Sequence, residues 1–350
     1  MVEWSIARQV ARLAVGSEEL AELCLDLREL CAEMELHVAG CTQLELSAPA
    51  PRAELVSRRE WAELNLAGLE RMLDPVSERL DERLAFAGPL AGALRLGAGA
   101  MIAAEAGLVL GYVSQRVLGQ YELSLLGAET PPRLVSVAPN LDRAVRELDV
   151  DARSFFGWIA IHELTHVFQF QGVPWLRDHL GGLTREYLAT VDVKIRGDAR
   201  GLPALPDLSR LVEAFRHGGL VALAQTRQQR ELMERMNAAM AVVEGYSEYV
   251  MDALGERLLP SYEGLRDAMS RRRQSRSAPE RILQRLLGLD LKLRQYEQGR
   301  SFCDLVVARE GMTGLNRVWS SPEALPSAAE LGQPERWLER IRTRSLEPAL

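Results

Sequence analysis

Two histidines and a glutamate interrupt an apolar run in the middle of the chain, where W-I-A-I-H-E-L-T-H-V-F-Q-F-Q spans residues 158–171. Side chains four residues apart lie above one another on a helix, so His162 and His166 can direct imidazole nitrogens at one point. Imidazole is a common zinc ligand, and Glu163 would lie beside such an ion, where it can take a proton from water. The spacing H-E-x-x-H therefore predicts a zinc site with two ligands and a general base.

The residues that flank this motif favour a buried helix beneath a cleft. Ile161, Leu164, Val167 and Phe168 are all apolar. Burying histidine and glutamate among such neighbours is costly, and coordination of a cation would offset that cost. The ordinary alternative is a core histidine pair that is satisfied by hydrogen bonds alone. We favour the metal.

A catalytic zinc usually takes a third protein ligand and leaves one position for water. The extended zinc motif with a glycine and a third histidine is excluded, because Gln169 and Gly172 occupy those positions. His179 and His217 are further candidates, but neither stands in a context that singles it out. The third ligand must therefore be sought elsewhere in the chain.

A stronger candidate lies in M-A-V-V-E-G-Y-S-E-Y-V-M-D, residues 240–252, where Glu244, Glu248 and Asp252 recur every four residues. Three acids on one helical face repel one another unless a positive charge lies nearby. We expect Glu244 to be the third ligand, with Glu248 as the next choice for that role. As a neighbour of the site, Glu248 would hold the outer nitrogen of a ligating histidine.

Hydrolysis would also need a donor for the oxyanion and a place for the substrate. The candidate donors are Tyr246, Tyr249, Tyr296 and His217, although each has a simpler structural role, so the sequence does not identify the donor. The segment R-L-V-S-V, residues 133–137, is predicted to be a strand. If it lay at a sheet edge, an extended peptide could add to it as a further strand.

Composition limits the classes of protein that the chain can represent. Its 350 residues are 47% hydrophobic, which is enough for a substantial core, and the net charge of -7 gives no reason to expect nucleic acid as a partner. The four cysteines form no C-x-x-C pair, which favours a reducing compartment. The first residues lack the layout of a secretory signal, so we expect a cytoplasmic protein.

Helical periodicity dominates the sequence, over residues 4–36, 61–80 and 208–254. Residues 97–113 approach the length of a membrane span but contain Glu105, so we predict a buried helix and no stable membrane insertion. Strands are expected only at residues 43–46 and 133–137. The prediction is a mainly α protein with at most a small β-sheet, comprising a helical N-terminal region at residues 1–130 and a catalytic region at residues 131–350.

Several stretches together resemble a known family, the zincin-like metallopeptidases of the second type, which are associated with biosynthesis of a deazaflavin coenzyme in actinobacteria and Chloroflexi. The likeness covers most of the chain and includes R-R-E-W-A-E-L-N, V-L-G-Q-Y-E-L, S-V-A-P-N-L, I-H-E-L-T-H-V-F-Q-F, E-G-Y-S-E-Y-V-M-D and L-K-L-R-Q-Y-E-Q-G-R-S-F. It implies a largely helical zincin whose ligands are His162, His166 and a glutamate of the E-G-Y-S-E segment. This agrees with the choice of Glu244 made from the residues.

The functional hypothesis is a zinc-dependent metallopeptidase that acts on a peptide or protein, with Zn²⁺ as the cofactor and Glu163 as the general base. Two alternatives stay open. One is a helical binding or scaffold protein that retains zinc without turnover. The other is an amide hydrolase that acts on a small-molecule intermediate.

Overall fold

The computed structural model describes residues 2–16, 23, 25–84, 91–126, 130–190, 226–260, 262–274 and 289–346. Two compact units emerge from the contacts within the chain. Unit 1 comprises residues 1–40, 45–171 and 254–268, and unit 2 comprises residues 41–44, 172–253 and 269–350. Both are discontinuous in sequence, whereas the predicted regions 1–130 and 131–350 are continuous, and that division stays a prediction.

Unit 1 contains a small sheet of three strands, β1 (Ala53–Val56), β2 (Gly119–Glu122) and β3 (Arg133–Val137), in the order β1-β3-β2. β1 pairs with β3 in parallel, and β2 pairs with β3 in the antiparallel sense. The mainly helical fold with a small sheet is confirmed. The predicted strand at residues 133–137 is β3, but it is the central strand, so its proposed role as a sheet edge for a peptide was wrong.

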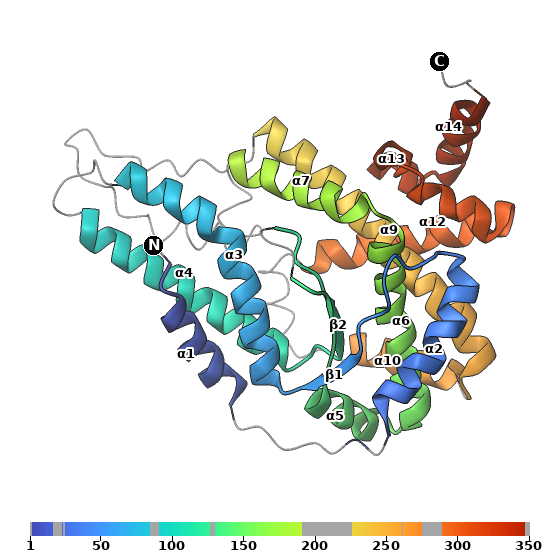
Figure 1. Cartoon of the computed structure of the whole chain (residues 1–350), viewed down its shortest axis with the longest axis horizontal. Coiled ribbons are helices and arrows are strands. Elements are labelled where there is room, and N and C mark those ends of the chain that lie inside the picture. The colour runs from blue at the N-terminus through green and yellow to red at the C-terminus, as the bar shows by residue number, and fades with distance from the viewer. Residues whose placement is uncertain are drawn as a thin grey trace. The chain divides into compact units, whose positions relative to one another are not determined.

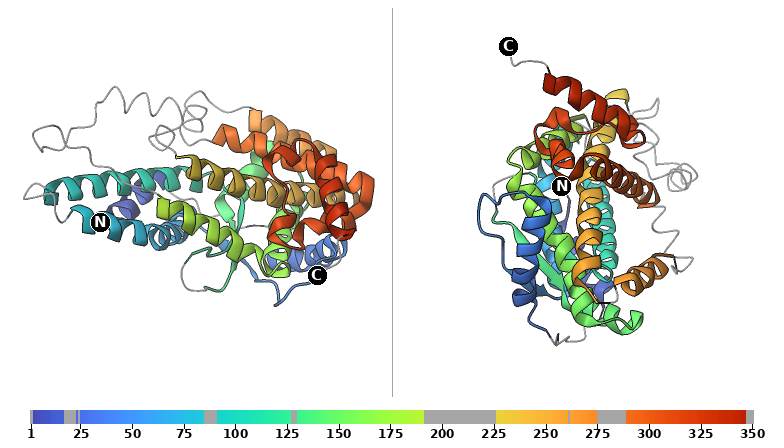
Figure 2. Two further views of the ribbon diagram at one scale, coloured as in Figure 1. Left: turned by 90° about the horizontal axis from the view of Figure 1, so that it is seen from above. Right: turned by 90° about the vertical axis from the view of Figure 1, so that its right-hand side faces the viewer.

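Helices cover both faces of this sheet. Successive side chains of β3 point to opposite sides, so β3 contributes apolar side chains to the packing on each face. Val135 and Val137 pack in one core with Trp4, Trp61 and Leu66. Those partners come from α1 (Trp4–Val15) and α3 (Arg58–Leu84), which pack with α4 (Ala91–Ser114). Figures 1 and 2 show α1, α3 and α4 side by side.

On the opposite face, Leu134 and Ser136 of β3 line a small cavity with residues of three helices. These helices are α2 (Leu27–Thr42), α5 (Ala138–Leu148) and α6 (Ala152–Gly172). α5 begins directly after β3 with Pro139 in its first turn, where the missing N–H costs nothing. The sheet therefore lies between two helical layers, and α6 belongs to the second of them.

Unit 2 is built from helices in the part that the structure describes. They are α7 (Leu176–Thr190), most of α9 (Arg227–Leu258), α12 (Leu289–Leu315), α13 (Ala328–Leu331) and α14 (Pro334–Leu346), with short 3-10 turns at Asn316–Trp319 and Pro322–Ala324. α10 (Tyr262–Gln274) begins in unit 1. α12 packs with α13 and α14, which the orange-to-red ribbons of Figure 2 show.

Some predicted elements differ from the observed ones. The helical pattern of residues 4–36 is divided between α1 and α2, and residues 43–46 form no strand because α2 continues to Thr42 and Gln43 then takes a positive φ of 56°. The pattern at 61–80 lies within α3 and is confirmed. Residues 208–225 lie outside the described residues, and the rest of that predicted helix lies in α9.

The apolar segment 97–113 is helical, as part of α4, but the prediction of a buried helix was wrong on one face. Met101 is 63% exposed and Leu108 is 56% exposed, since α1 and α3 cover only part of this helix. Within the described ranges, none of the helices combines the length and the apolar composition that crossing a lipid bilayer requires.

Two glycines allow α9 and α12 to pack backbone against backbone within unit 2. A Cβ atom on Gly299 would overlap the carbonyl group of Ala241, and one on Gly245 would overlap the backbone of Gly299. Side chains at these positions would force the helices apart. The glycine of the E-G-Y-S-E segment is therefore a packing residue, next to Glu244 in the sequence.

We predict that Gly299→Ala lowers the free energy of unfolding by about 3 kcal/mol, because the methyl group has no space and the obstacle is backbone. Urea denaturation would measure the loss. Gly182→Ala is the matched control in α7, since nothing lies within 4 Å of its Cβ position. It should leave stability unchanged or raise it by up to about 1 kcal/mol. Equal stability of both variants would contradict the backbone contact.

Candidate metal centre

The predicted zinc motif lies on α6, a helix that is buried on nearly every side. Asp151 precedes the helix and accepts a hydrogen bond from the backbone N–H of Ser154 at 2.7 Å, which caps its first turn. Hydrogen bonds from Ser154 lower the pKa of Asp151. Ile161, Leu164, Val167 and Phe168 are all buried, as the sequence predicted.

His162 and His166 face one another on this helix. Their Nε2 atoms are 3.2 Å apart, and their rings meet edge to face with centroids 4.7 Å apart. Two nitrogens that bind one tetrahedral zinc at about 2.0–2.1 Å would lie about 3.3 Å from each other. The pair therefore fits a zinc ion without a change of backbone.

Gln169 orients His166. Its side-chain oxygen lies 2.9 Å from Nδ1 of His166, one helical turn away, and the glutamine itself is fully buried. An amide oxygen can only accept, so Nδ1 carries the proton and Nε2 presents its lone pair toward His162. At the level of sequence, Gln169 served only to exclude a longer motif. Its position three residues after His166 was the signal that could have identified this role.

Glu163 is held by the edge strand β2. Its Oε2 accepts a hydrogen bond of 2.8 Å from the backbone N–H of Tyr121. Tyr121 stands opposite Leu134 of β3, at a position where the backbone groups of β2 point away from the sheet. A charge-assisted bond of this kind fixes the direction of the carboxylate. Glu163 is 9% exposed, so the candidate base is both oriented and largely buried.

Gly119 allows β2 to come this close to α6. A Cβ atom at this position would lie 3.0 Å from Cγ of Glu163, 3.1 Å from Cγ2 of Ile159 and 3.2 Å from Oε1 of Glu163. Such contacts are tighter than ordinary van der Waals packing, and they would displace the carboxylate. Gly119, the glycine of V-L-G-Q-Y-E-L, thus leaves the space that the Glu163 side chain occupies.

The surroundings of Glu163 are apolar on the side of α2. Cys31 lies with Glu163 at a small cavity, and burial, followed by the charges of Glu163 and Glu35, raises the pKa of the Cys31 thiol to about 12. The thiol therefore stays protonated at neutral pH. It lines the space behind the carboxylate as a small apolar group.

The acidic residues predicted from the E-G-Y-S-E segment all lie on α9. Glu244 and Glu248 are half-buried and stand one turn apart. Asp252 forms an ion pair with Arg300 of α12, and Arg300 also lies 3.6 Å from Asp304. An arginine thus neutralises one of the three stacked acids, so repulsion among them is weaker than their spacing alone suggests.

Other candidates from the sequence have different surroundings. Tyr246 is fully buried, and its hydroxyl lies 2.9 Å from Oδ1 of Asn316 and 3.3 Å from the carbonyl oxygen of Thr42, so it serves packing within unit 2. Tyr249 is half-buried on the same helix. His179 packs against the ring of Trp175, and burial lowers its pKa. His217 lies outside the described residues, as does the side chain of Tyr296.

A mainly helical protein that carries H-E-x-x-H on a buried helix beside a small sheet has the features of a zincin. The family model described as zincin-like metallopeptidase matches residues 2–338, so the chain belongs to this family. The family resemblance predicted from the sequence is thus confirmed. No curated protein matches the chain.

A solved structure is similar along nearly the whole chain. It is a protein from Chloroflexus aurantiacus that is provisionally assigned as a hydrolase and is described as having a novel fold. The two are 30% identical with a TM-score of 0.71, and the match covers 98% of this chain and 99% of that one.

We predict that Gln169→Met weakens zinc binding 10- to 100-fold, because the Nδ1 proton of His166 loses its acceptor and the ring loses its orientation. Competition with a chromophoric chelator would measure the affinity. Gln171→Met is the matched control on the same helix, since the side-chain oxygen of Gln171 is buried and has no hydrogen-bond partner among the described residues. Equal affinities in the two variants would show that Gln169 does not position the ligand.

Proposed function

We propose that the protein is a zinc-dependent hydrolase, specifically a metallopeptidase. His162 and His166 hold the metal, and Glu163 is the general base. The observation that carries this proposal is the 3.2 Å separation of the two Nε2 atoms on a buried helix, with the next residue's carboxylate fixed by a backbone N–H. Membership of the zincin-like family supports the same chemistry.

Glu244 is the third ligand in this proposal. What supports it is the sequence of the E-G-Y-S-E segment, in which Glu244 is a half-buried acid on α9, and the family likeness that this segment carries. Two imidazoles and one carboxylate are a common donor set for a hydrolytic zinc. Glu248, one turn further along α9, is proposed to orient a ligating histidine.

In the proposed reaction the metal and the residues around it have separate roles. Zinc supplies Lewis acidity, which makes water more acidic and polarises a carbonyl group. Glu163 accepts the proton of the attacking water and later delivers it to the leaving amine. The N–H of Tyr121 holds the Glu163 carboxylate in one rotamer during both transfers. The apolar side chains around α6 limit the entry of other water molecules.

Two other functions are compatible with the same site. A zinc-retaining scaffold would bind the metal but hydrolyse nothing, and an amide hydrolase on a small intermediate would ignore peptides. The peptide substrate is preferred because the family is one of metallopeptidases. Comparing hydrolysis of a mixed peptide library with that of small amides would distinguish the three.

We predict that Glu163→Gln lowers kcat by 10²- to 10⁴-fold and leaves one equivalent of zinc bound, because the amide cannot accept the proton. The glutamine oxygen can still accept the hydrogen bond from Tyr121, so the fold should persist. Metal content and peptide hydrolysis would be measured on the same sample. Glu105→Gln, on the exposed face of α4, is the control and should behave as the wild type.

The third ligand can be tested separately by zinc titration of two variants on α9. We predict that Glu244→Ala removes stoichiometric zinc binding, whereas Glu248→Ala weakens it only 10- to 100-fold, since a residue that orients a ligand contributes less than the ligand. Circular dichroism would confirm that the helices remain. The reverse order of the two effects would assign the ligand to Glu248.

A further inference from the structure

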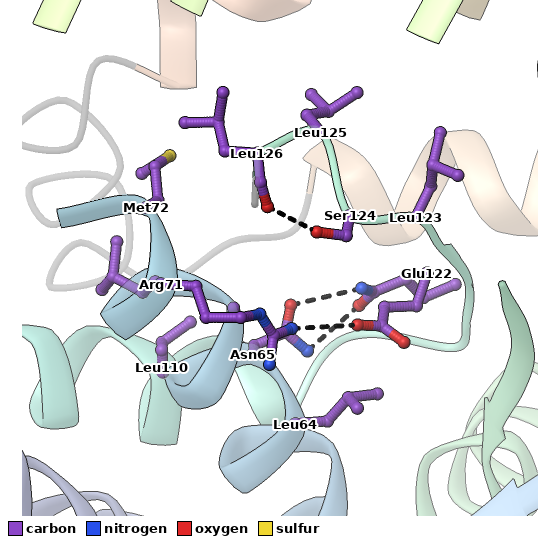
Figure 3. A pocket seen from close by; sticks show the side chains of 13 residues that line it. Leu64, Asn65, Arg71, Met72, Leu110, Glu122, Leu123, Ser124, Leu125 and Leu126 are labelled. Carbon is purple, nitrogen blue, oxygen red and sulfur yellow. Dashed lines mark hydrogen bonds and ion pairs between the residues drawn. The ribbon is translucent and has the colours of Figure 1, made fainter. Parts of the chain in front are cut away.

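Unit 1 has a pocket on the side of the sheet opposite α6. It lies among α3, α4, strand β2 and the segment that follows β2, and its volume is about 320 Å³ (Figure 3). Gln120 and Glu122 of β2 face this pocket, whereas Gly119 and Tyr121 contribute to the surroundings of Glu163. The volume is that of a site for a small organic molecule.

Most of the pocket wall is apolar. The side chains come from α3, α4 and the segment after β2, namely Leu64, Leu69, Leu110, Leu123, Leu125 and Leu126. Such a lining accepts an aliphatic side chain and gains from the apolar surface that it removes from water. The two charged lining residues, Arg71 and Glu122, are neighbours, and an apolar pocket with a few converging polar groups is the pattern of a binding site that orients its ligand.

The two charged residues of the pocket are poorly matched to one another. Nη2 of Arg71 lies 4.0 Å from Oε1 of Glu122, at the outer limit of an ion pair, although the Glu122 side chain is only 13% exposed. Nε of Arg71 is buried and has no hydrogen-bond partner within the described part of the chain. By contrast, the amides of Asn65 and Gln120 bond each other in both directions at 3.2 Å. Figure 3 shows Arg71 and Glu122 directed toward one another, with the long ion pair as a dashed line.

A ligand with one charge does not suit this arrangement. A simple carboxylate that approached Arg71 would also face the Glu122 carboxylate, and a simple amine at Glu122 would face the guanidinium. An α-amino acid carries its ammonium and carboxylate groups on one carbon, and Arg71 and Glu122 present the complementary charges side by side. The terminal nitrogens of Arg71 could then donate to the carboxylate oxygens, while Glu122 accepts from the ammonium group.

We propose that this pocket binds a free, zwitterionic α-amino acid with an aliphatic side chain, such as leucine. Arg71 binds the α-carboxylate, Glu122 binds the α-ammonium group, and the leucines hold the side chain. Binding replaces one long ion pair by two short ones, and the charges of ligand and site cancel. The proposal does not depend on hydrolysis, because it concerns the other face of the sheet.

Isothermal titration of the full-length protein with L-leucine tests the proposal. We expect one site per chain, with at least tenfold weaker binding of 4-methylpentanoate, which lacks the ammonium group, and of 3-methylbutylamine, which lacks the carboxylate. L-Serine should also bind at least tenfold more weakly, because it leaves the leucines uncovered. Failure of leucine to bind at millimolar concentration, or equal binding of either analogue, would overturn the proposal.

Variants locate the site. Arg71→Gln and Glu122→Gln should each weaken leucine binding at least tenfold, whereas Arg12→Gln, in the same unit and paired with Glu63 at the surface, should have no effect. Gly68→Leu is the steric test. Its Cβ position meets only the end of Arg71 at 4.0 Å, so the new side chain would fill the pocket while the charges remain.

Gly68→Leu also tests whether a loss of leucine binding is caused by misfolding. Leucine favours a helix more than glycine does, so its thermal midpoint should equal or exceed that of the wild type while leucine binding disappears. Full leucine affinity in Gly68→Leu would place any binding outside this pocket and would refute the assignment.

Discussion

The site depends on the i, i+4 geometry of a helix that is buried on almost every side. α6 places the Nε2 atoms of His162 and His166 3.2 Å apart, and buried apolar neighbours leave those side chains few other directions. Polar groups in such surroundings need partners, because an unsatisfied one costs free energy of folding. Gln169 supplies a partner for His166, and Tyr121 supplies one for Glu163.

The small sheet serves the site mainly through its edge. β2 is short, and its outward N–H at Tyr121 bonds the Glu163 carboxylate instead of remaining open to another strand. This use of the edge satisfies a donor that would otherwise invite pairing with another chain. It also makes the position of the candidate base depend on Gly119, the residue that lets strand and helix approach.

Local patterns predicted much of this arrangement. The motif on α6, its buried flanks, the mainly helical fold and strand β3 could all be predicted, because each depends on residues close together in sequence. The order of the strands could not, since the pairing of β3 with both β1 and β2 joins segments that lie far apart. For the same reason neither the bond between Tyr121 and Glu163 nor the pairing of Arg300 with Asp252 could be predicted. Glu244 and Glu248 remain predictions of ligand and orienting residue.

The contact between Gly245 and Gly299 bears on how relatives of this protein should be interpreted. The two glycines lie in two of the stretches that carry the family likeness, yet they serve the packing of α9 against α12. A relative that had lost the two histidines would still need both glycines, because a larger residue at either position would require a wider spacing between α9 and α12. Retention of these two glycines would therefore trace the architecture, whereas retention of His162, Glu163 and His166 would trace the proposed chemistry.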